Sequence, residues 1–156
     1  MSPHRPRTLT PIQRIPGLNY GVLDELLGYS LRRAQVTMFV AFHEATRGMN
    51  ITPPRFTALV IIGANAGLSQ TVLGKVLGIA RSGAMVMTDF LEKRGLIERR
   101  RPPGDARSWG LHLTRRGQQL VDRMKARVLD HDYRYSRKLS REERQEMLRL
   151  LEKLAQ

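Results

Sequence analysis

The sequence predicts a mainly α-helical fold with one small β-hairpin. Apolar residues recur three and four positions apart along most of the chain, which is the spacing of amphipathic helices. One pair of short segments, 96–99 and 110–113, has strand character, and the turn formers Pro102, Pro103 and Gly104 lie between them. The chain has 156 residues and is 41% apolar, which is enough for the core of a single domain.

The chain carries a large positive charge. It has 27 lysine and arginine residues against 14 aspartate and glutamate residues, a formal net charge of +13. This excess favours a polyanionic partner, either nucleic acid or an anionic membrane surface. No stretch approaches the roughly 18 consecutive apolar residues of a membrane span, so we expect no membrane insertion. Cysteine is absent, which excludes disulfides and thiol-based redox sensing and is typical of an intracellular, cytoplasmic protein.

A basic arm and a long helix are predicted at the N-terminus. Residues 1–20 contain four prolines and three arginines but no signal-peptide segment, so we expect an extended or flexible arm. From residue 20 to 49 proline is absent, and apolar residues such as Leu27, Leu31 and Met38 recur at helical spacing. This helix would be a core helix, or would also contribute to a dimer interface.

Three shorter helices are predicted next. Thr52 and Pro53 suit the N-cap and the first position of a helix that ends near Asn65. Ser69 can cap a short second helix, and after a tight glycine turn a third helix occupies about residues 81–94. The second and third helices have the composition of a helix-turn-helix, although such pairs also occur in all-α domains that bind nothing.

The segment from Arg99 to Gly110, RRRPPGDARSWG, is either a basic linker or the tip of a hairpin. Apolar strand-like segments bracket it closely on both sides, which favours the hairpin. Residues 99–116 contain six arginines against one aspartate, hence a charge of +5. A hairpin beside a helix-turn-helix is a winged helix, so residues 52–113 are predicted to form a winged helix-turn-helix lobe.

Two further helices are predicted after Thr114. The first runs to about Lys138, and Ser140 with Glu143 can form a capping box for the last one. The winged-helix lobe needs neither helix. Together with the helix of residues 21–49 they would be surplus in a monomer, so we expect a homodimer.

Six segments occur in a characteristic order along the chain: LGYSLRRAQ (27–35), ITPPRFTAL (51–59), GLSQTVLGKVLGI (67–79), RSGAMVMTDFLEKRGLIERR (81–100), PPGDARSWGLHLTRRG (102–117) and LSREERQEMLRLL (139–151). In this order and spacing they resemble the MarR family of bacterial transcriptional regulators. The resemblance implies one unit over residues 21–156, with dimerisation helices in 21–49 and 114–156. It also implies a DNA-binding repressor of cytoplasmic, nucleoid-associated location, whose partner is double-stranded DNA with a pseudo-palindromic operator.

The same resemblance implies which residues contact DNA. The helix of residues 81–94 would enter the major groove, and Arg107 would enter the adjacent minor groove while Asp105 steadies it. A narrow A·T-rich minor groove concentrates negative potential, and a guanidinium held by a carboxylate loses less entropy there. The expected recognition-helix residues are Arg81, Ser82, Gly83, Met85 and Val86, and the expected wing residues are Arg99, Arg100, Arg101, Asp105 and Arg107.

Several positions depart from the family pattern. Ala80 and Gly83 stand where the family often has Asp and a hydroxyl residue, which weakens the start of the helix. Val86 stands where a basic residue is frequent, so one candidate guanine contact is missing. Met85 and Val86 can contact thymine methyl groups, so we expect recognition that prefers A·T base pairs or depends on DNA shape. Trp109 either packs against the hairpin or stacks on a base.

Many members of the family release DNA when a small aromatic or phenolic acid binds near the dimerisation helices. An arginine that faces an aromatic-lined cleft would suit such a carboxylate. Core packing is the more frequent role of the two phenylalanines among the candidates, and a structural role is the more frequent one for the histidine. The candidates near the junction of the first two helices are Tyr29, Arg33, Phe42, His43, Arg55 and Phe56.

No enzyme is indicated. The histidines His4, His43, His112 and His131 are scattered, and no zinc-protease motif, Gly-rich phosphate loop or serine elbow is present. We therefore expect no catalytic residues, no metal ion and no cofactor. The remaining alternative is a ligand-independent architectural protein that binds DNA phosphates with little specificity.

Overall fold

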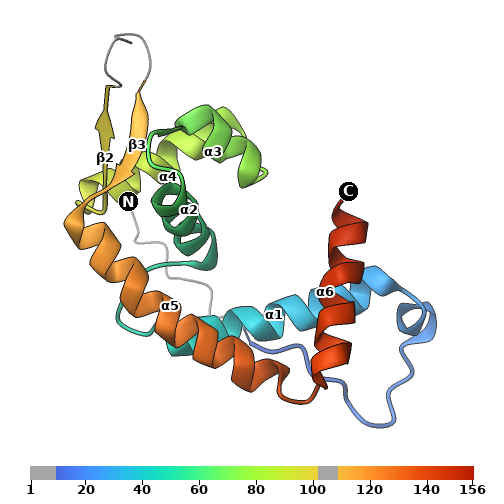
Figure 1. Cartoon of the computed structure of the whole chain (residues 1–156). Coiled ribbons are helices and arrows are strands. Elements are labelled where there is room, and N and C mark those ends of the chain that lie inside the picture. Colours follow the sequence, from blue (N-terminus) through green and yellow to red (C-terminus); the bar gives the residue numbers. More distant parts are fainter. Residues whose placement is uncertain (1–9, 102–108) are drawn as a thin grey trace, which may run out of the picture. The chain divides into compact units, whose positions relative to one another are not determined.

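A computed structural model of the chain describes residues 10–101 and 109–156 (Figure 1). The chain divides into two compact units. The first combines Met1–Ala45 with Val128–Gln156, and the second is Thr46–Arg127. The predicted winged-helix lobe, residues 52–113, lies inside the second unit, while the predicted N- and C-terminal helices contribute most of the first.

The second unit combines short helices with a small sheet, as the sequence predicts (Figure 1). Its sheet is antiparallel in the order β1-β3-β2, so β3 is the central strand. The elements of this unit are α2 (Pro53–Ala64), β1 (Leu68–Ser69), α3 (Gln70–Val76), α4 (Arg81–Lys93), β2 (Ile97–Arg100), β3 (Gly110–Leu113) and the first part of α5 (Arg115–Ser136).

The predicted hairpin is confirmed, with two differences. Strand β2 begins at Ile97 rather than Leu96, because the amide of Leu96 still donates to the carbonyl of Leu91 at the end of α4, at 3.0 Å. Strand β1 was not predicted. Two residues are too few for an alternating pattern, and this strand exists only because Leu68 pairs with Leu111 of β3.

The core of the second unit lies between its helices and its sheet. Helical spacing predicts that Leu73, Val76 and Leu77 of the short second helix face inward. Leu73 is buried, but the prediction is wrong for Val76, which is 54% exposed. Helix α3 has only seven residues, and its buried residues are Leu73 and Gly74. The largest fully buried side chains are Leu59, Ile62, Leu73, Leu91, Leu96, Ile97, Leu111, Met124, Val121 and Thr88.

The start of α5 is locked to the end of α4. The hydroxyl of Thr114 accepts from the amide of Gly117 at 3.0 Å, the predicted cap, and donates to the carbonyl of Gly95 at 2.7 Å. Gly117 is buried so closely against β2 that a Cβ there would overlap the carbonyl oxygen of Leu96. Only glycine therefore allows this helix to approach the sheet.

The first unit contains a 3₁₀ turn, Gly21–Asp24, then α1 (Leu27–Ala45), the end of α5 and α6 (Arg141–Ala155). The predicted continuous helix of residues 20–49 is wrong at both ends. The side chain of Asn19 accepts from the amide of Gly21 at 2.8 Å and holds the 3₁₀ turn, which precedes α1. After α1, the amide of Met49 donates to the carbonyl of Thr46, and Gly48 has a φ of 82°, so the chain turns before α2.

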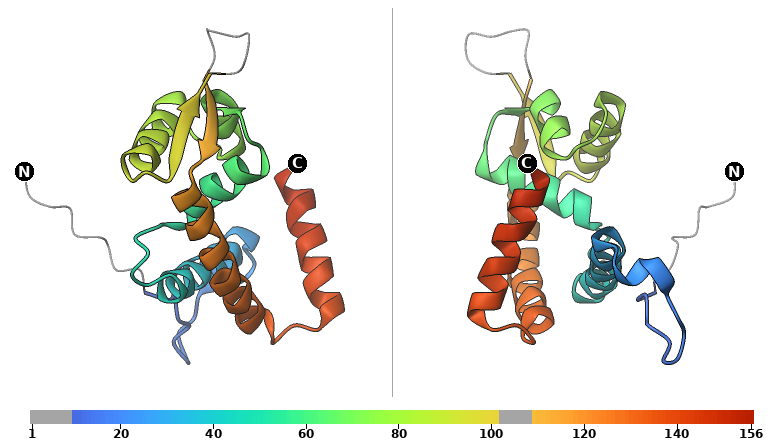
Figure 2. Two further views of the ribbon diagram at one scale, coloured as in Figure 1. Left: turned by 60° about the vertical axis from the view of Figure 1, so that its left-hand side comes forward. Right: turned by 90° about the vertical axis from the view of Figure 1, so that its right-hand side faces the viewer.

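Helix α6 has the predicted capping box but no buried residue. The hydroxyl of Ser140 accepts from the amide of Glu143 at 3.2 Å, and the carboxylate of Glu143 accepts from the amide of Ser140 at 2.7 Å. Figure 2 shows α6 (red) leaving the turn that follows α5, and Arg144 ties it to Asp132 of α5 at 2.7 Å. Its apolar residues Met147, Leu148, Leu150, Leu151 and Leu154 are all exposed.

No helix of the two described segments has both the length and the apolar character needed to cross a membrane.

The close approach at Gly117 predicts a stability effect. Gly117→Ala should lower the free energy of unfolding by about 1–3 kcal/mol, because the added methyl group displaces backbone rather than a flexible side chain. Gly83→Ala is the matched control, since its Cβ would lie 3.6 Å from Ile79 and should stabilise α4 by about 0.5–1 kcal/mol. Urea unfolding measures both. Equal stability of the two variants would contradict the packing described.

Candidate nucleic-acid interface

The first half of α4 forms an exposed surface. Arg81 and Ser82 are exposed, and Met85 and Val86 are 51% and 67% exposed, so apolar side chains stand on this surface without cover from the described residues. Ala80, the N-cap residue, makes no side-chain capping hydrogen bond. The first amides of α4 are therefore free of a capping side chain, and such groups bind phosphates well.

The opposite face of α4 packs on α3. Ala84, Thr88 and Leu91 are buried, and a Cβ placed on Gly74 of α3 would lie only 3.2 Å from the Cβ of Ala84. Between the helices Gly78 has a φ of 63°, which glycine adopts without strain. The predicted helix-turn-helix is confirmed, and its close helix contact fixes which face of α4 points outward.

Arg99 joins the hairpin to both helices. Its Nη2 donates to Asp89 Oδ1 at 2.7 Å, to Thr88 Oγ1 at 2.9 Å and to Gln70 Oε1 at 3.4 Å. Its Nη1 binds the carboxylate of Glu92. The guanidinium of Arg99 in β2 thus contacts two carboxylates and a hydroxyl of α4, and also the side-chain amide of Gln70 in α3. We call Arg99 and these four partners the Arg99 network.

The Arg99 network was not foreseen from the sequence, where Arg99 is expected to face DNA. The missed signal is the pair Asp89 and Glu92, two acids one turn apart on a helix of a chain with a charge of +13. Two acids on a DNA-reading helix repel phosphates unless a cation neutralises them. The side chain of Arg99 is only 24% exposed, so it faces the protein more than the solvent.

The described part of the wing contains two exposed arginines. Arg100 forms an ion pair with Glu98 of the same strand, and Arg101 lies over the ring of Trp109, 4.7 Å from its centroid. Trp109, which precedes β3, therefore contacts the residue that follows β2. Asp105 and Arg107, the predicted minor-groove pair, lie outside the described residues.

The candidate ligand residues fall in both units. In α1 the guanidinium of Arg33 lies 5.8 Å from the ring centroid of Tyr29. Its Nε is buried and has no hydrogen-bond partner among the described residues. Phe42, which is buried, and His43 meet edge to face with their ring centroids 6.2 Å apart. Each of these two pairs lies within the first unit.

Arg55 and Phe56 belong to the second unit, and Phe56 is half-buried in α2. The guanidinium of Arg55 stacks 3.5 Å from the ring centroid of Phe90, and Arg94 lies 5.6 Å from the same centroid. These three residues and Asn50 line a hollow of about 320 Å³. Burial, and after it the nearby charge of Arg94, lowers the pKa of Arg55.

Within residues 10–101 and 109–156, no three histidine or acidic side chains are grouped so that they could hold a metal ion.

Comparison with known proteins places the chain among regulators. A model described as MarR family matches residues 49–108. A putative transcriptional regulatory protein for the hcr operon of Thauera aromatica is 35% identical over 138 residues, which cover 88% of this chain and 83% of that protein.

Solved structures extend the similarity to nearly the whole chain. The transcriptional repressor CouR bound to a 23-mer DNA duplex superposes with a TM-score of 0.84 at 39% identity, over 89% of this chain and 99% of that one. CouR bound to p-coumaroyl-CoA has a TM-score of 0.80 at 37% identity, over 89% and 98%. The Mycobacterium tuberculosis MarR family protein Rv2887 in complex with salicylic acid has a TM-score of 0.66 at 29% identity, over 83% and 96%.

The Arg99 network predicts a measurable coupling. In a double-mutant cycle, Arg99→Met and Asp89→Asn should couple by about 0.5–1.5 kcal/mol, because the pair is partly shielded from water. The neighbouring pair Arg100 and Glu98 is more exposed, and the cycle of Arg100→Met with Glu98→Gln should give about 0–0.5 kcal/mol. Chemical denaturation of the variants measures both. Equal coupling would show that Arg99 is an ordinary surface arginine.

Proposed function

The chain belongs to the MarR family of transcriptional regulators, and on this basis we propose that it is a dimeric, sequence-specific repressor that an aromatic ligand releases from its operator. The observation that carries the proposal is the exposed first half of α4, which α3 and the Arg99 network hold beside a basic hairpin. We propose no catalytic role. A repressor of this kind acts on the bacterial nucleoid, within the cytoplasm.

In this proposal α4 enters the major groove. Arg81, Ser82 and the uncapped amides at the start of α4 would bind phosphates, and Gly83 would let the helix approach closely. Met85 and Val86 would contact thymine methyl groups, since neither can donate a hydrogen bond to guanine.

The wing would add phosphate contacts from Arg100 and Arg101, and Trp109 would hold Arg101 by its cation–π contact. Arg99 has a different role in the proposal, because its guanidinium is occupied by α4 and α3. We assign it to positioning the wing against the recognition helix. Minor-groove insertion of Arg107, steadied by Asp105, remains the prediction of the sequence.

The apolar residues of the first unit support dimerisation. Leu27, Leu31 and Met38 of α1 and five apolar residues of α6 are exposed among the described residues. Exposed apolar surface on this scale is typical of an interface rather than of a monomer. A second copy of the chain would cover it and would place two recognition helices on two halves of a palindrome.

The ligand proposal rests on Arg33. A buried N–H group without a partner costs about 1–3 kcal/mol, and a carboxylate would satisfy it. Tyr29 beside it offers a ring face for an aromatic body. The ligands of the similar structures, p-coumaroyl-CoA and salicylic acid, are of this aromatic type. We propose an aromatic carboxylate, with Arg33 as its partner and Phe42, His43, Arg55 and Phe56 as further candidates.

Two observations favour the second candidate, an architectural DNA-binding protein. The chain has a charge of +13. The exposed residue at position 86 is a valine, which cannot form a hydrogen bond to a base edge. Binding to a palindrome from the protein's own upstream region and to random DNA at roughly 150 mM salt separates the two functions. A repressor should prefer the palindrome by about 10³ or more, whereas less than about tenfold preference would establish the architectural function.

The DNA contact of α4 predicts the effect of Arg81→Ala. Affinity for the palindrome should fall about tenfold, and the slope of log affinity against log salt should decrease by about 0.9, because one phosphate contact is lost. Lys125→Ala removes the same charge from an exposed position of α5 and should leave both quantities unchanged. Fluorescence anisotropy of labelled DNA measures them. An Arg81→Ala variant that matched the control would remove α4 from the interface.

The ligand contact predicts the effect of Arg33→Met. Release of DNA by salicylate should require at least about tenfold more ligand, because the charge-assisted bond to the carboxylate is lost. Affinity for DNA without salicylate should not change. Arg32→Met is the control, since Arg32 is the neighbouring exposed arginine of α1. Equal sensitivity of both variants to salicylate would contradict the role of Arg33.

A further inference from the structure

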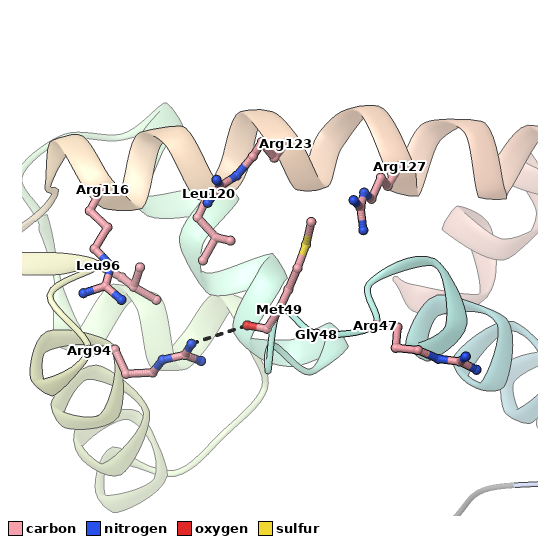
Figure 3. A pocket seen from close by; sticks show the side chains of 9 residues that line it. All are labelled: Arg47, Gly48, Met49, Arg94, Leu96, Arg116, Leu120, Arg123 and Arg127. Atoms are coloured by element: carbon pink, nitrogen blue, oxygen red, sulfur yellow. Dashed lines mark hydrogen bonds between the residues drawn. The ribbon is translucent and has the colours of Figure 1, made fainter.

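Five arginines line a hollow of about 410 Å³ in the second unit (Figure 3). They are Arg47, Arg94, Arg116, Arg123 and Arg127, and we call the site the arginine hollow. Its remaining lining residues are Gly48, Met49, Leu96 and Leu120, so none of the described residues that line it is acidic. Its volume lies within the roughly 300–1,000 Å³ of small-molecule sites.

One face of α5 supplies three of these arginines. Arg116, Arg123 and Arg127 are seven and four positions apart, so they lie on the same side of the helix as Leu120. Figure 3 shows Arg116 extending from α5 toward Leu96 and Arg94, whereas Arg47 points away from α5. A Cβ placed on Gly95 would lie 3.9 Å from Arg116 Nη1. Because Gly95 directly follows Arg94, Arg116 reaches the backbone beside Arg94.

Neutral groups hold Arg94 in place. Its Nη1 donates to the carbonyl of Asn50 at 2.6 Å and its Nη2 to the carbonyl of Met49 at 3.4 Å, while Phe90 lies beside its guanidinium. Backbone carbonyls and a ring fix the position of the cation but do not cancel its charge. Arg94 is therefore oriented in advance for an anion.

No carboxylate of the described residues forms an ion pair with an arginine of the hollow. Elsewhere in the described segments Arg99, Arg100, Arg134, Arg144 and others form ion pairs with carboxylates, but none of the five arginines of the hollow does. The C-terminal end of α4 contributes only about half a negative charge. Arg55, whose guanidinium also lies over the ring of Phe90, adds a further positive charge near Arg94.

The arginine hollow lies away from the surface proposed to read DNA. Arg81 begins α4 and Arg94 follows its last residue, and the thirteen-residue helix is about 20 Å long. A concave site of this volume also fits a compact anion better than the convex backbone of a duplex.

We propose that the arginine hollow binds the phosphate groups of a small organophosphate that carries a pyrophosphate or several phosphates. One guanidinium group can donate two parallel hydrogen bonds to the oxygens of a phosphate group. Several arginines in one hollow therefore match a ligand with several phosphates. Met49, Leu96 and Leu120 provide an apolar surface for the organic part of the ligand. This site goes beyond the proposed repressor function and would exist in a lobe that bound no DNA.

Calorimetric titration of the full-length chain with pyrophosphate tests the proposal. Arg123→Gln with Arg127→Gln removes two exposed arginines of the hollow, and Arg115→Gln with Lys125→Gln removes two exposed cations of α5 outside it. The first variant should bind pyrophosphate at least about tenfold more weakly than the unmodified chain, because two charge-assisted contacts are lost. The control should change the affinity less than about twofold, since screening weakens distant charges.

Further titrations identify the class of ligand that carries the phosphate groups. ATP represents nucleoside polyphosphates, coenzyme A represents phosphorylated coenzymes, and AMP carries a single phosphate. Tighter binding of either ATP or coenzyme A than of AMP, lost in the hollow variant, supports the proposal and names the source. Equal pyrophosphate affinity of the hollow and control variants would overturn it. A loss of DNA affinity in the hollow variant with unchanged pyrophosphate binding would overturn it as well and would assign these arginines to DNA.

Discussion

The Arg99 network is the contact on which the geometry of the DNA-binding lobe depends. A guanidinium in β2 reaches Thr88, Asp89 and Glu92 of α4 and Gln70 of α3, so hairpin and helix-turn-helix cannot move independently. Contacts to a major and a minor groove require a fixed offset between the elements that make them. The network also neutralises the two acids of α4, which would otherwise repel a phosphate backbone.

Helix α4 has a different chemical character at each part of its length. Its start is uncapped, basic and exposed, which suits DNA. Its middle carries the acids that bind β2, and Arg94, just after its end, belongs to the arginine hollow. A ligand anion at Arg94 and DNA at Arg81 would thus contact opposite ends of one rigid element. The net charge of +13 is therefore divided among surfaces with separate roles.

Local signals were sufficient for most of the fold. The helix-turn-helix, the hairpin, the caps at Ser140 and Thr114 and the family were all predicted correctly. Each cap and turn depends on residues a few positions apart. The prediction failed for the helix of residues 20–49. Apolar residues keep their helical spacing beyond both ends of α1, although the backbone turns at Gly21 and Gly48. For Val76 the prediction failed because the period of a seven-residue helix does not define one inward face.

The sequence by itself determined most of the helices, the caps at Ser140 and Thr114, and that a basic hairpin follows a helix-turn-helix, because these features depend on neighbouring residues. Only the tertiary structure decided which arginines are available to a partner. Arg99, Arg100 and Arg101 are adjacent and chemically identical, yet Arg99 binds residues 7, 10, 11 and 29 positions away. Likewise Arg94 and Arg123 share one hollow although they are distant in the chain. Such pairings depend on how the elements pack, and no local pattern encodes them.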